Sequence, residues 1–122
     1  MPAPFAIEER TEGSVHILSL IGSLDGHTFV EFEKRLEQVL GQGTRFLVLD
    51  LSQLNYIASA GVGIMVNCLR RVKQAQGNIV LHRPTSIVTQ VIEVLGLASL
   101  FIIEADLDRA IAQAGGVDQA SS

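Results

Sequence analysis

The segment at residues 46–51 (FLVLDL) is apolar at nearly every position, and it constrains the fold more than any other part of the chain. A strand that is apolar on both faces has to be covered on both, which is typical of a parallel sheet with helices packed against it. Shortly afterwards, the apolar residues between positions 62 and 72 recur at helical spacing. A buried strand followed by a helix predicts an α/β fold with parallel crossovers.

The same alternation of strand-like and helix-like patterns continues along the chain. We expect strands at residues 5–8, 15–21, 46–51, 78–81 and 100–103, and helices that begin at Thr28, at Ser59, at Pro84 or Thr85, and at Asp106. Thr28 and Glu31 have the spacing of a capping box, in which each side chain bonds the free backbone N–H of the other. Residues 9–13 and 22–27 are expected in turns or loops. These patterns predict a four- to five-stranded mixed, mainly parallel sheet with about four helices largely on one side.

The length and composition fit a single domain. A chain of 122 residues leaves little room for a second domain. Hydrophobic residues make up 48% of it, which is enough for an ordered core. We expect the domain at residues 1–113, and we expect residues 114–122, which are mostly small and polar, to form a flexible C-terminal tail.

The composition also disfavours several classes of function. No apolar run approaches the roughly 18–20 residues of a membrane span, and the first residues lack a secretory signal, so we expect a cytoplasmic protein without membrane insertion. A net charge of −4 without a block of basic residues argues against nucleic acid as a partner. The single cysteine, Cys68, excludes an internal disulfide and disfavours a cysteine-rich metal site. The high apolar content leaves homodimerisation open.

Candidate groups for enzyme chemistry are few. His16, His27 and His82 lie in different segments without the spacing of metal ligands, so no metal site is expected. A Ser59–His27–Asp25 triad is disfavoured, because residues two positions apart do not easily line up one behind the other and no G-x-S-x-G elbow is present. We therefore expect no catalytic residues.

Two glycines, Gly61 and Gly63, invite comparison with a nucleotide-binding loop. The third glycine of G-x-G-x-x-G is absent, because Val66 occupies its position, and no G-K-[ST] follows. Close approach of the backbone at a helix start explains these glycines better, and no cofactor is expected.

Ser59 lies at the junction between a predicted buried strand and a predicted helix. Serine is a preferred N-cap residue, so its position alone predicts a structural cap. A phosphate on this serine would also sit at the positive end of the helix dipole. Two aspartates have structural interpretations as well. Asp25 beside a glycine is typical of a turn, and Asp50, near the end of a strand, is placed to accept N–H bonds from the following loop.

The residues around Ser59 resemble the signature of STAS domains, the anti-sigma factor antagonist family. Residues 47–63 (LVLDLSQLNYIASAGVG) are similar to the family pattern of an apolar strand, Asp-Leu-Ser, an aromatic-apolar pair and then Asp-Ser-Ser/Thr-Gly-Leu-Gly. Residues 20–25 (LIGSLD) resemble the family's Leu-x-Gly-x-Leu-Asp, and residues 87–101 resemble its later helix and short strand. The resemblance covers nearly the whole chain and implies a STAS-type fold.

The resemblance also implies a function. The chain would be a bacterial regulator of transcription, in sporulation or a stress response, that binds an ATP-binding serine kinase acting as an anti-sigma factor and so releases a sigma factor. In the family, the kinase phosphorylates the serine that corresponds to Ser59, which ends binding, and a phosphoserine phosphatase would reverse this. The implied partner-binding residues are Ser23, Asp25, Ser59, Gly61 and Val62.

Two neighbours of Ser59 depart from the family pattern. Ala58 replaces the family's aspartate and Ala60 replaces its second serine or threonine. This departure keeps a second interpretation open, in which the chain is a STAS binding module without phosphorylation, in a lipid-transport ABC complex or a stress-signalling scaffold.

Overall fold

The computed structural model describes residues 5–116 of the chain. Strands and helices alternate after an initial pair of strands, as the sequence predicts. The elements are β1 (Ala6–Glu12), β2 (Val15–Leu24), α1 (Phe29–Gly41), β3 (Phe46–Ile57), α2 (Ser59–Gln74), β4 (Asn78–His82), α3 (Ser86–Val94), a 3-10 turn (Ala98–Leu100), β5 (Ile102–Glu104), α4 (Leu107–Ile111) and a wider helical turn (Ala112–Gly116).

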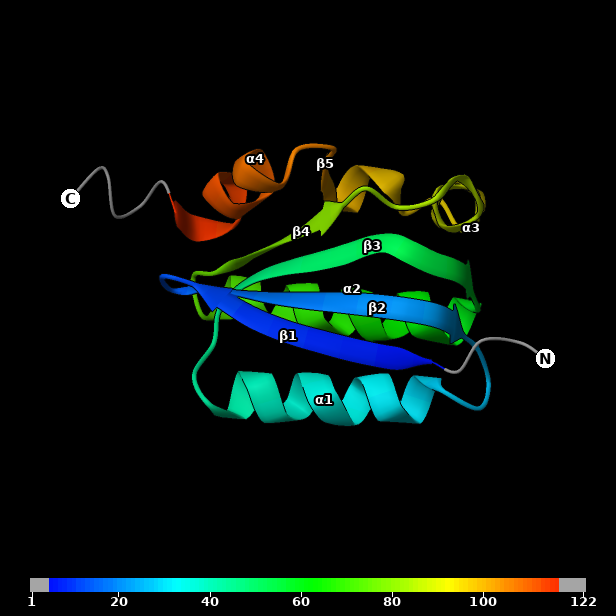
Figure 1. Cartoon of the computed structure of the whole chain (residues 1–122), viewed down its shortest axis with the longest axis horizontal. Coiled ribbons are helices and arrows are strands. Elements are labelled where there is room, and N and C mark those ends of the chain that lie inside the picture. Colours follow the sequence, from blue (N-terminus) through cyan, green and yellow to red (C-terminus); the bar gives the residue numbers. More distant parts are fainter. Residues whose placement is uncertain (1–4, 117–122) are drawn as a thin grey trace.

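The five strands form one sheet in the order β1-β2-β3-β4-β5 (Figure 1). Strand β1 pairs antiparallel with β2, and the other three pairs are parallel. The predicted mixed, mainly parallel sheet is therefore confirmed. The polar residues 9–13 are mostly strand rather than the turn that we expected, because the chain reverses over two residues at Gly13, whose φ is +60°.

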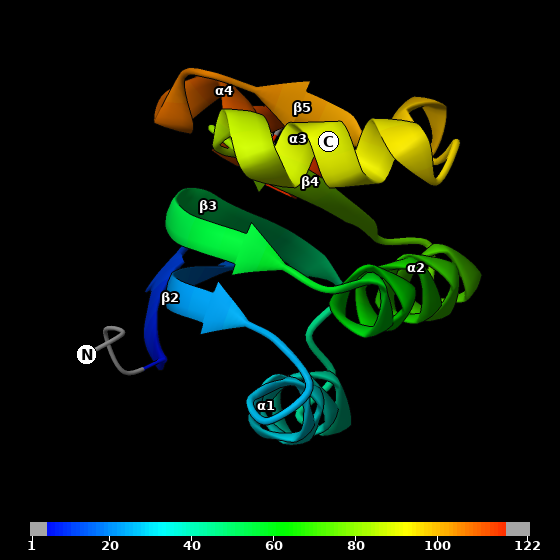
Figure 2. The ribbon, with the colours of Figure 1, turned by 90° about the vertical axis from the view of Figure 1, so that its right-hand side faces the viewer.

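Side chains on the two faces of the sheet build two separate apolar clusters. Leu18 and Leu20 of β2 belong to the larger cluster, which contains the buried faces of α1, α2 and α3. Val15 and Ile17 point to the opposite face, where α4 and the turn after it cover them. Three helices thus lie on one face and α4 on the other (Figure 2). No helix within residues 5–116 combines the length and the apolar character that crossing a bilayer needs.

Strand β3 is twice as long as predicted and reaches the start of α2. Its buried residues beyond Leu49 are Leu51, Leu54 and Ile57, spaced by two and then three positions. The register with β2 shifts twice along this part, which marks β-bulges. Each bulge adds a residue to β3 and breaks the alternation of a regular strand. The sequence analysis therefore ended this strand too early. Strand β2 also runs on to Leu24, through residues expected in a loop, because Gly22 and Ser23 continue its alternation of buried and half-buried positions although their residue types are typical of turns.

The C-terminal elements differ from the prediction in their bounds. Strand β5 is shorter, because residues 98–100 form a 3-10 turn. Ala114 and Gly115, the first residues of the expected tail, are buried, and Gly115 lies so close to the Phe46 ring that a Cβ there would be 2.5 Å from it. Residues 117–122 of that tail lie outside the described residues.

Candidate functional site

The candidate site lies at the end of the sheet where β2 and β3 finish. Figure 2 looks onto this end, where the chain passes from β2 toward α1 and from β3 into α2. Leu24 and Ile57, the last residues of the two strands, are paired in register, and the N–H of Ala58 donates to the carbonyl of Leu24 over 2.8 Å. Asp25 follows Leu24 and Ser59 follows Ala58, so the tertiary fold brings both residues to the same end of the sheet.

Ser59 is the first residue of α2 and not its cap. The N-cap is Ala58, whose extended backbone (φ −84°, ψ 160°) suits that position but whose methyl group cannot accept a hydrogen bond. The prediction that Ser59 caps the helix is therefore wrong. Its side chain is exposed, and its hydroxyl has no partner among residues 5–116. The N–H groups of Ser59 and Ala60 belong to the first turn, where no preceding carbonyl of the helix is available to them.

The loop between β2 and α1 is held rigidly by its own side chains. The Asp25 carboxylate accepts from the N–H of His27 over 2.9 Å and from that of Thr28 over 3.1 Å. The Thr28 hydroxyl donates to the carbonyl of Ser23 over 2.7 Å and accepts from the N–H of Asp25 over 2.9 Å. The expected turn role of Asp25 is confirmed. The capping box of Thr28 and Glu31 is not formed, because the hydroxyl is turned back to the loop.

These hydrogen bonds keep Asp25 charged. The pKa of its carboxyl is lowered, first by the N–H of His27 and then by the N–H and hydroxyl of Thr28, because each stabilises the ionised form. The loop that begins at Asp25 thus carries a negative charge at the end of the sheet where Ser59 lies. The Asp25 carboxylate meets the backbone of His27 and not its ring, so the imagined triad is not formed.

Two of the predicted partner-binding residues are buried. Val62 is 0% exposed, and Gly61 is packed so tightly that a Cβ would lie 2.7 Å from Leu24 Cδ2. Close approach therefore explains Gly61, as predicted, whereas Gly63 has nothing within 4 Å and that explanation is wrong for it. Because they are buried, Gly61 and Val62 lie beneath the surface of the site and do not form part of it.

Exposed apolar side chains at this end come from residues that the sequence analysis did not select. Tyr56 pairs in register with Ser23 and is 47% exposed, and Val30 in the first turn of α1 is 48% exposed. Large exposed aromatic side chains are enriched at protein interfaces, and Tyr56 is the single tyrosine of the chain. Its position three residues before Ser59 in the sequence could have indicated that Tyr56 belongs to the site.

The other candidate residues lie away from this site. The Asp50 carboxylate accepts from the N–H of Ser52 over 3.1 Å, which confirms its predicted bond to the residues that follow. His16 contacts Glu9, and His82 contacts the carbonyl of Glu104. Burial raises the pKa of the Cys68 thiol to about 12. Within residues 5–116, no group of three His, Cys, Asp or Glu side chains could hold a metal ion.

Comparison with known proteins identifies the family. The chain belongs to the STAS domain family, whose pattern matches residues 6–110. It is 33% identical over 85 residues to BtrV of Bordetella bronchiseptica, which is named for a proposed role as an anti-sigma factor antagonist; the match covers 70% of this chain and 73% of BtrV. It is 25% identical over 114 residues to the anti-sigma F factor antagonist of Lysinibacillus sphaericus, covering 93% and 96% of the two chains. The chain is thus a member of the anti-sigma factor antagonist family.

The fold is also that of the anti-sigma factor antagonist SpoIIAA. The structure of its unphosphorylated form has a TM-score of 0.76 and 22% identity, and the match covers 90% of this chain and 95% of SpoIIAA. The structure of the phosphorylated form, from Bacillus, has a TM-score of 0.67 and 19% identity, covering 96% and 99%. The STAS-type fold is therefore confirmed.

Proposed function

We propose that this chain binds an anti-sigma factor with serine kinase activity while the Ser59 hydroxyl is free, and that phosphorylation of Ser59 ends the binding. The observation that carries the proposal is the exposed hydroxyl of Ser59, which has no partner among residues 5–116 and lies at the same end of the sheet as the ionised Asp25. Binding would release a sigma factor, and a phosphoserine phosphatase would restore the active form. The naming of SpoIIAA structures by phosphorylated and unphosphorylated forms supports the proposal.

The physical basis of the switch is a charge that the chain tolerates and the partner does not. A phosphate adds about −1.5 to −2 charges at neutral pH. At the first turn of α2 it meets unpaired N–H groups and the positive end of the helix dipole, which stabilise an anion by roughly 0.3–1 kcal/mol at an exposed position. Burial of that charge against a partner, at the surface that includes Asp25, costs more free energy than the helix start supplies. The fold is therefore expected to survive the modification that abolishes binding.

The surface proposed for the partner consists of Ser59 and Ser23, Asp25 in the loop, and the exposed side chains of Tyr56 and Val30. Gly61 and Val62 hold the start of α2 against the sheet. The proposal assigns them a supporting role, because neither presents a surface to a partner.

The test is incubation of the chain with the cognate kinase and ATP, followed by mapping of the phosphorylated residue by mass spectrometry. We expect phosphate on Ser59, and we expect Ser59→Asp, but not Ser59→Ala, to lose affinity for the kinase in calorimetry. Ser86→Asp is the matched control, since Ser86 is also the exposed first residue of a helix. Phosphate found on other serines alone, or equal affinity of Ser59→Asp and Ser59→Ala, would sink the switch.

A second function is favoured by one feature, the alanines on both sides of Ser59. Without polar neighbours for a kinase to recognise, the same surface would serve a STAS module that binds a partner permanently, in a lipid-transport ABC complex or a stress-signalling scaffold. The genes that adjoin this one distinguish the two functions. A kinase-like ATPase with a sigma factor supports the switch, and transporter subunits support the module.

A further inference from the structure

A hollow lies on the face of the sheet that carries α4, and none of its lining residues belongs to the site at Ser59. Its volume is about 320 Å³, at the small end of the range for ligand pockets, roughly 300–1,000 Å³. Side chains of β1, β2 and β3 form its floor, and Leu107, the first residue of α4, forms one wall. The hollow exists because α4 is only five residues long and leaves the adjoining part of this face uncovered.

The register of the sheet brings polar side chains together here. Glu8 of β1 pairs with Ser19 of β2, and Ser19 pairs with Asp50 of β3, so the three side chains form a row on one face. Between Asp50 and Gln53 the register with β2 shifts by one residue. This bulge directs Gln53, rather than Ser52, into the hollow beside Asp50.

The Asp50 carboxylate is fixed in place and still accessible. One oxygen accepts from the N–H of Ser52 over 3.1 Å and from its hydroxyl over 2.7 Å, and the other is 3.4 Å from the hydroxyl of Ser19. The long contact to Ser19 leaves the second oxygen open to a stronger donor, because good hydrogen bonds between oxygens measure about 2.5–3.0 Å.

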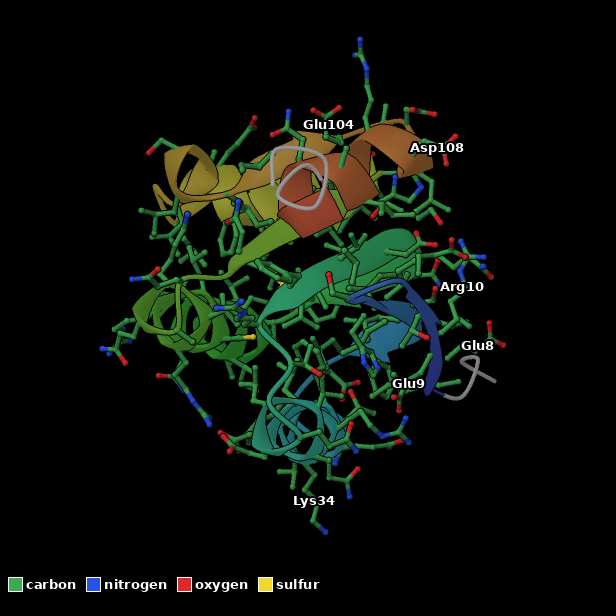
Figure 3. The ribbon with its side chains drawn as sticks, turned by 90° about the vertical axis from the view of Figure 1, so that its left-hand side faces the viewer. Glu8, Glu9, Arg10, Lys34, Glu104 and Asp108 are labelled. Carbon is green, nitrogen blue, oxygen red and sulfur yellow. The ribbon has the colours of Figure 1, made fainter. Side chains whose placement is uncertain are left out.

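The charges that face the hollow are not paired with each other. Glu8 and Arg10 have no hydrogen-bond or ion-pair partner among residues 5–116. Glu9 turns to the other face of the sheet and contacts His16 and Arg35. Figure 3 shows this division along β1, with Glu9 on the side of α1 and Arg10 on the side of α4. One guanidinium and two carboxylates thus face a hollow that has Leu107 as an apolar wall and the buried Ile17 beneath its floor.

We propose that this hollow binds a small organic molecule with one carboxylate and two ammonium groups, the chemical class of a basic amino acid. The carboxylate pairs with Arg10, whose guanidinium suits bidentate recognition of that group. The ammonium groups pair with Asp50 and Glu8, and the aliphatic stem packs against Leu107. The three charged side chains that face the hollow without an ion-pair partner among residues 5–116, Arg10, Glu8 and Asp50, sum to −1, which complements the net charge of +1 of such a ligand. This binding is independent of the function proposed for Ser59.

The test is titration of the full-length ¹⁵N-labelled chain with three probes, followed by amide chemical shifts. L-lysine carries both kinds of charge, cadaverine lacks the carboxylate, and glutarate lacks the ammonium groups. We expect saturable shifts for L-lysine at Ser19, Asp50 and Gln53, with a dissociation constant at or below about 1 mM, and at least about tenfold weaker binding of the other two. Equal binding of cadaverine, or no saturation with L-lysine, overturns the proposal.

Matched variants locate the binding. Arg10→Gln and Asp50→Asn are each expected to weaken L-lysine binding about tenfold or more, the equivalent of one charge-assisted contact. Asp50→Asn keeps an oxygen that accepts from Ser52, and unchanged shifts elsewhere in the spectrum verify its fold. Lys34→Gln is the control, because Lys34 lies on α1 at the far side of the molecule (Figure 3). An equal effect of the control variant shows non-specific attraction and overturns the proposal.

Discussion

The starts of α2 and α3 are built alike and differ in what holds them. Each helix follows a parallel strand of the same sheet, and each begins with an exposed serine, Ser59 in α2 and Ser86 in α3. The cap of α3 is Thr85, whose hydroxyl accepts from the N–H of Val88 over 3.4 Å and donates to the carbonyl of Leu54 over 2.9 Å. The cap of α2 is Ala58, which makes no side-chain bond.

The comparison shows that a serine at the start of a helix is not by itself a functional site. The helix dipole and the unpaired N–H groups are common to both positions. Ser59 differs because a hydrogen bond from Ala58 to Leu24 places it beside the loop with the ionised Asp25. The neighbours that the tertiary fold supplies distinguish the two serines, and four pairs of measurements test this.

The largest expected effect is on partner binding. Ser59→Asp should weaken binding of the kinase by about 30-fold or more, equivalent to roughly 2 kcal/mol, because a buried uncompensated charge has that cost. Ser86→Asp should change the affinity by less than about twofold, since exposed substitutions outside an interface have little effect. Calorimetry with both variants gives the comparison. If Ser86→Asp weakened binding as much as Ser59→Asp, the proposed surface would be wrong.

The next effect is on stability, through the glycines of the first turn of α2. Gly61→Ala should destabilise the chain by about 1–3 kcal/mol, because its Cβ would lie 2.7 Å from Leu24 Cδ2 and 3.1 Å from Ile57 Cγ1. Gly63→Ala meets nothing within 4 Å and should stabilise the helix by about 0.5–1 kcal/mol. Urea denaturation measures both. Equal changes in the two variants would contradict the tight packing of α2 on the sheet.

Substitutions of the two cap residues should change the stability of the chain in opposite directions. Thr85→Ala should destabilise the chain by about 1–2 kcal/mol, because α3 loses its cap and the carbonyl of Leu54 loses a donor. Ala58→Ser should stabilise by about 0.5–1 kcal/mol, because its backbone already has the extended conformation of a cap. Thermal unfolding of the two variants is the measurement. A loss of stability in Ala58→Ser would show that the first turn of α2 does not accept a cap.

The smallest effect is a pH dependence of stability. It comes from Asp25, which lies at the same end of the sheet as the start of α2. Its pKa is lowered below the ordinary value of 3.8, so the folded chain favours the ionised form. The stabilisation is complete well above that value and is lost as the pH falls through the lowered pKa. The difference in stability between the native chain and Asp25→Asn should therefore shrink from pH 7 to pH 3. A constant difference would show that the loop depends on the shape of the side chain and not on its charge.

Much of the fold was accessible from the sequence because its signals are local. The apolar run at residues 46–51 and the helical spacing that follows predicted the parallel crossover, and Thr85, one of the two expected starts of the third helix, is the cap of α3. The predicted end of β3 was wrong, because its bulges depend on the pairing with β2, and the predicted end of β2 was wrong, because Gly22 and Ser23 are residue types typical of turns. The spacing of apolar residues within a single strand does not predict where a bulge forms.

The candidate site divides in the same way. Ser59 and Asp25 could be selected from residue types and spacing, together with the resemblance to STAS domains. The burial of Gly61 and Val62 and the exposure of Tyr56 could not, because each depends on contacts between α2, β2 and β3. Thr28 was placed correctly at the start of α1, but the spacing of Asp25 and Thr28, which signals the bonded loop, was not used.

The sequence by itself determined the order of the strands and helices, the division of the apolar residues between them, and the presence of a serine where β3 gives way to α2. These follow from hydrophobic periodicity and backbone preferences, which act over a few residues. Only the tertiary structure decided that Asp25 and Ser59 lie at the same end of the sheet, that Gly61 packs against Leu24, and that Glu8, Ser19 and Asp50 form one row. Those relations join residues that lie far apart in the chain, and the pairing of strands and the packing of α2 create them.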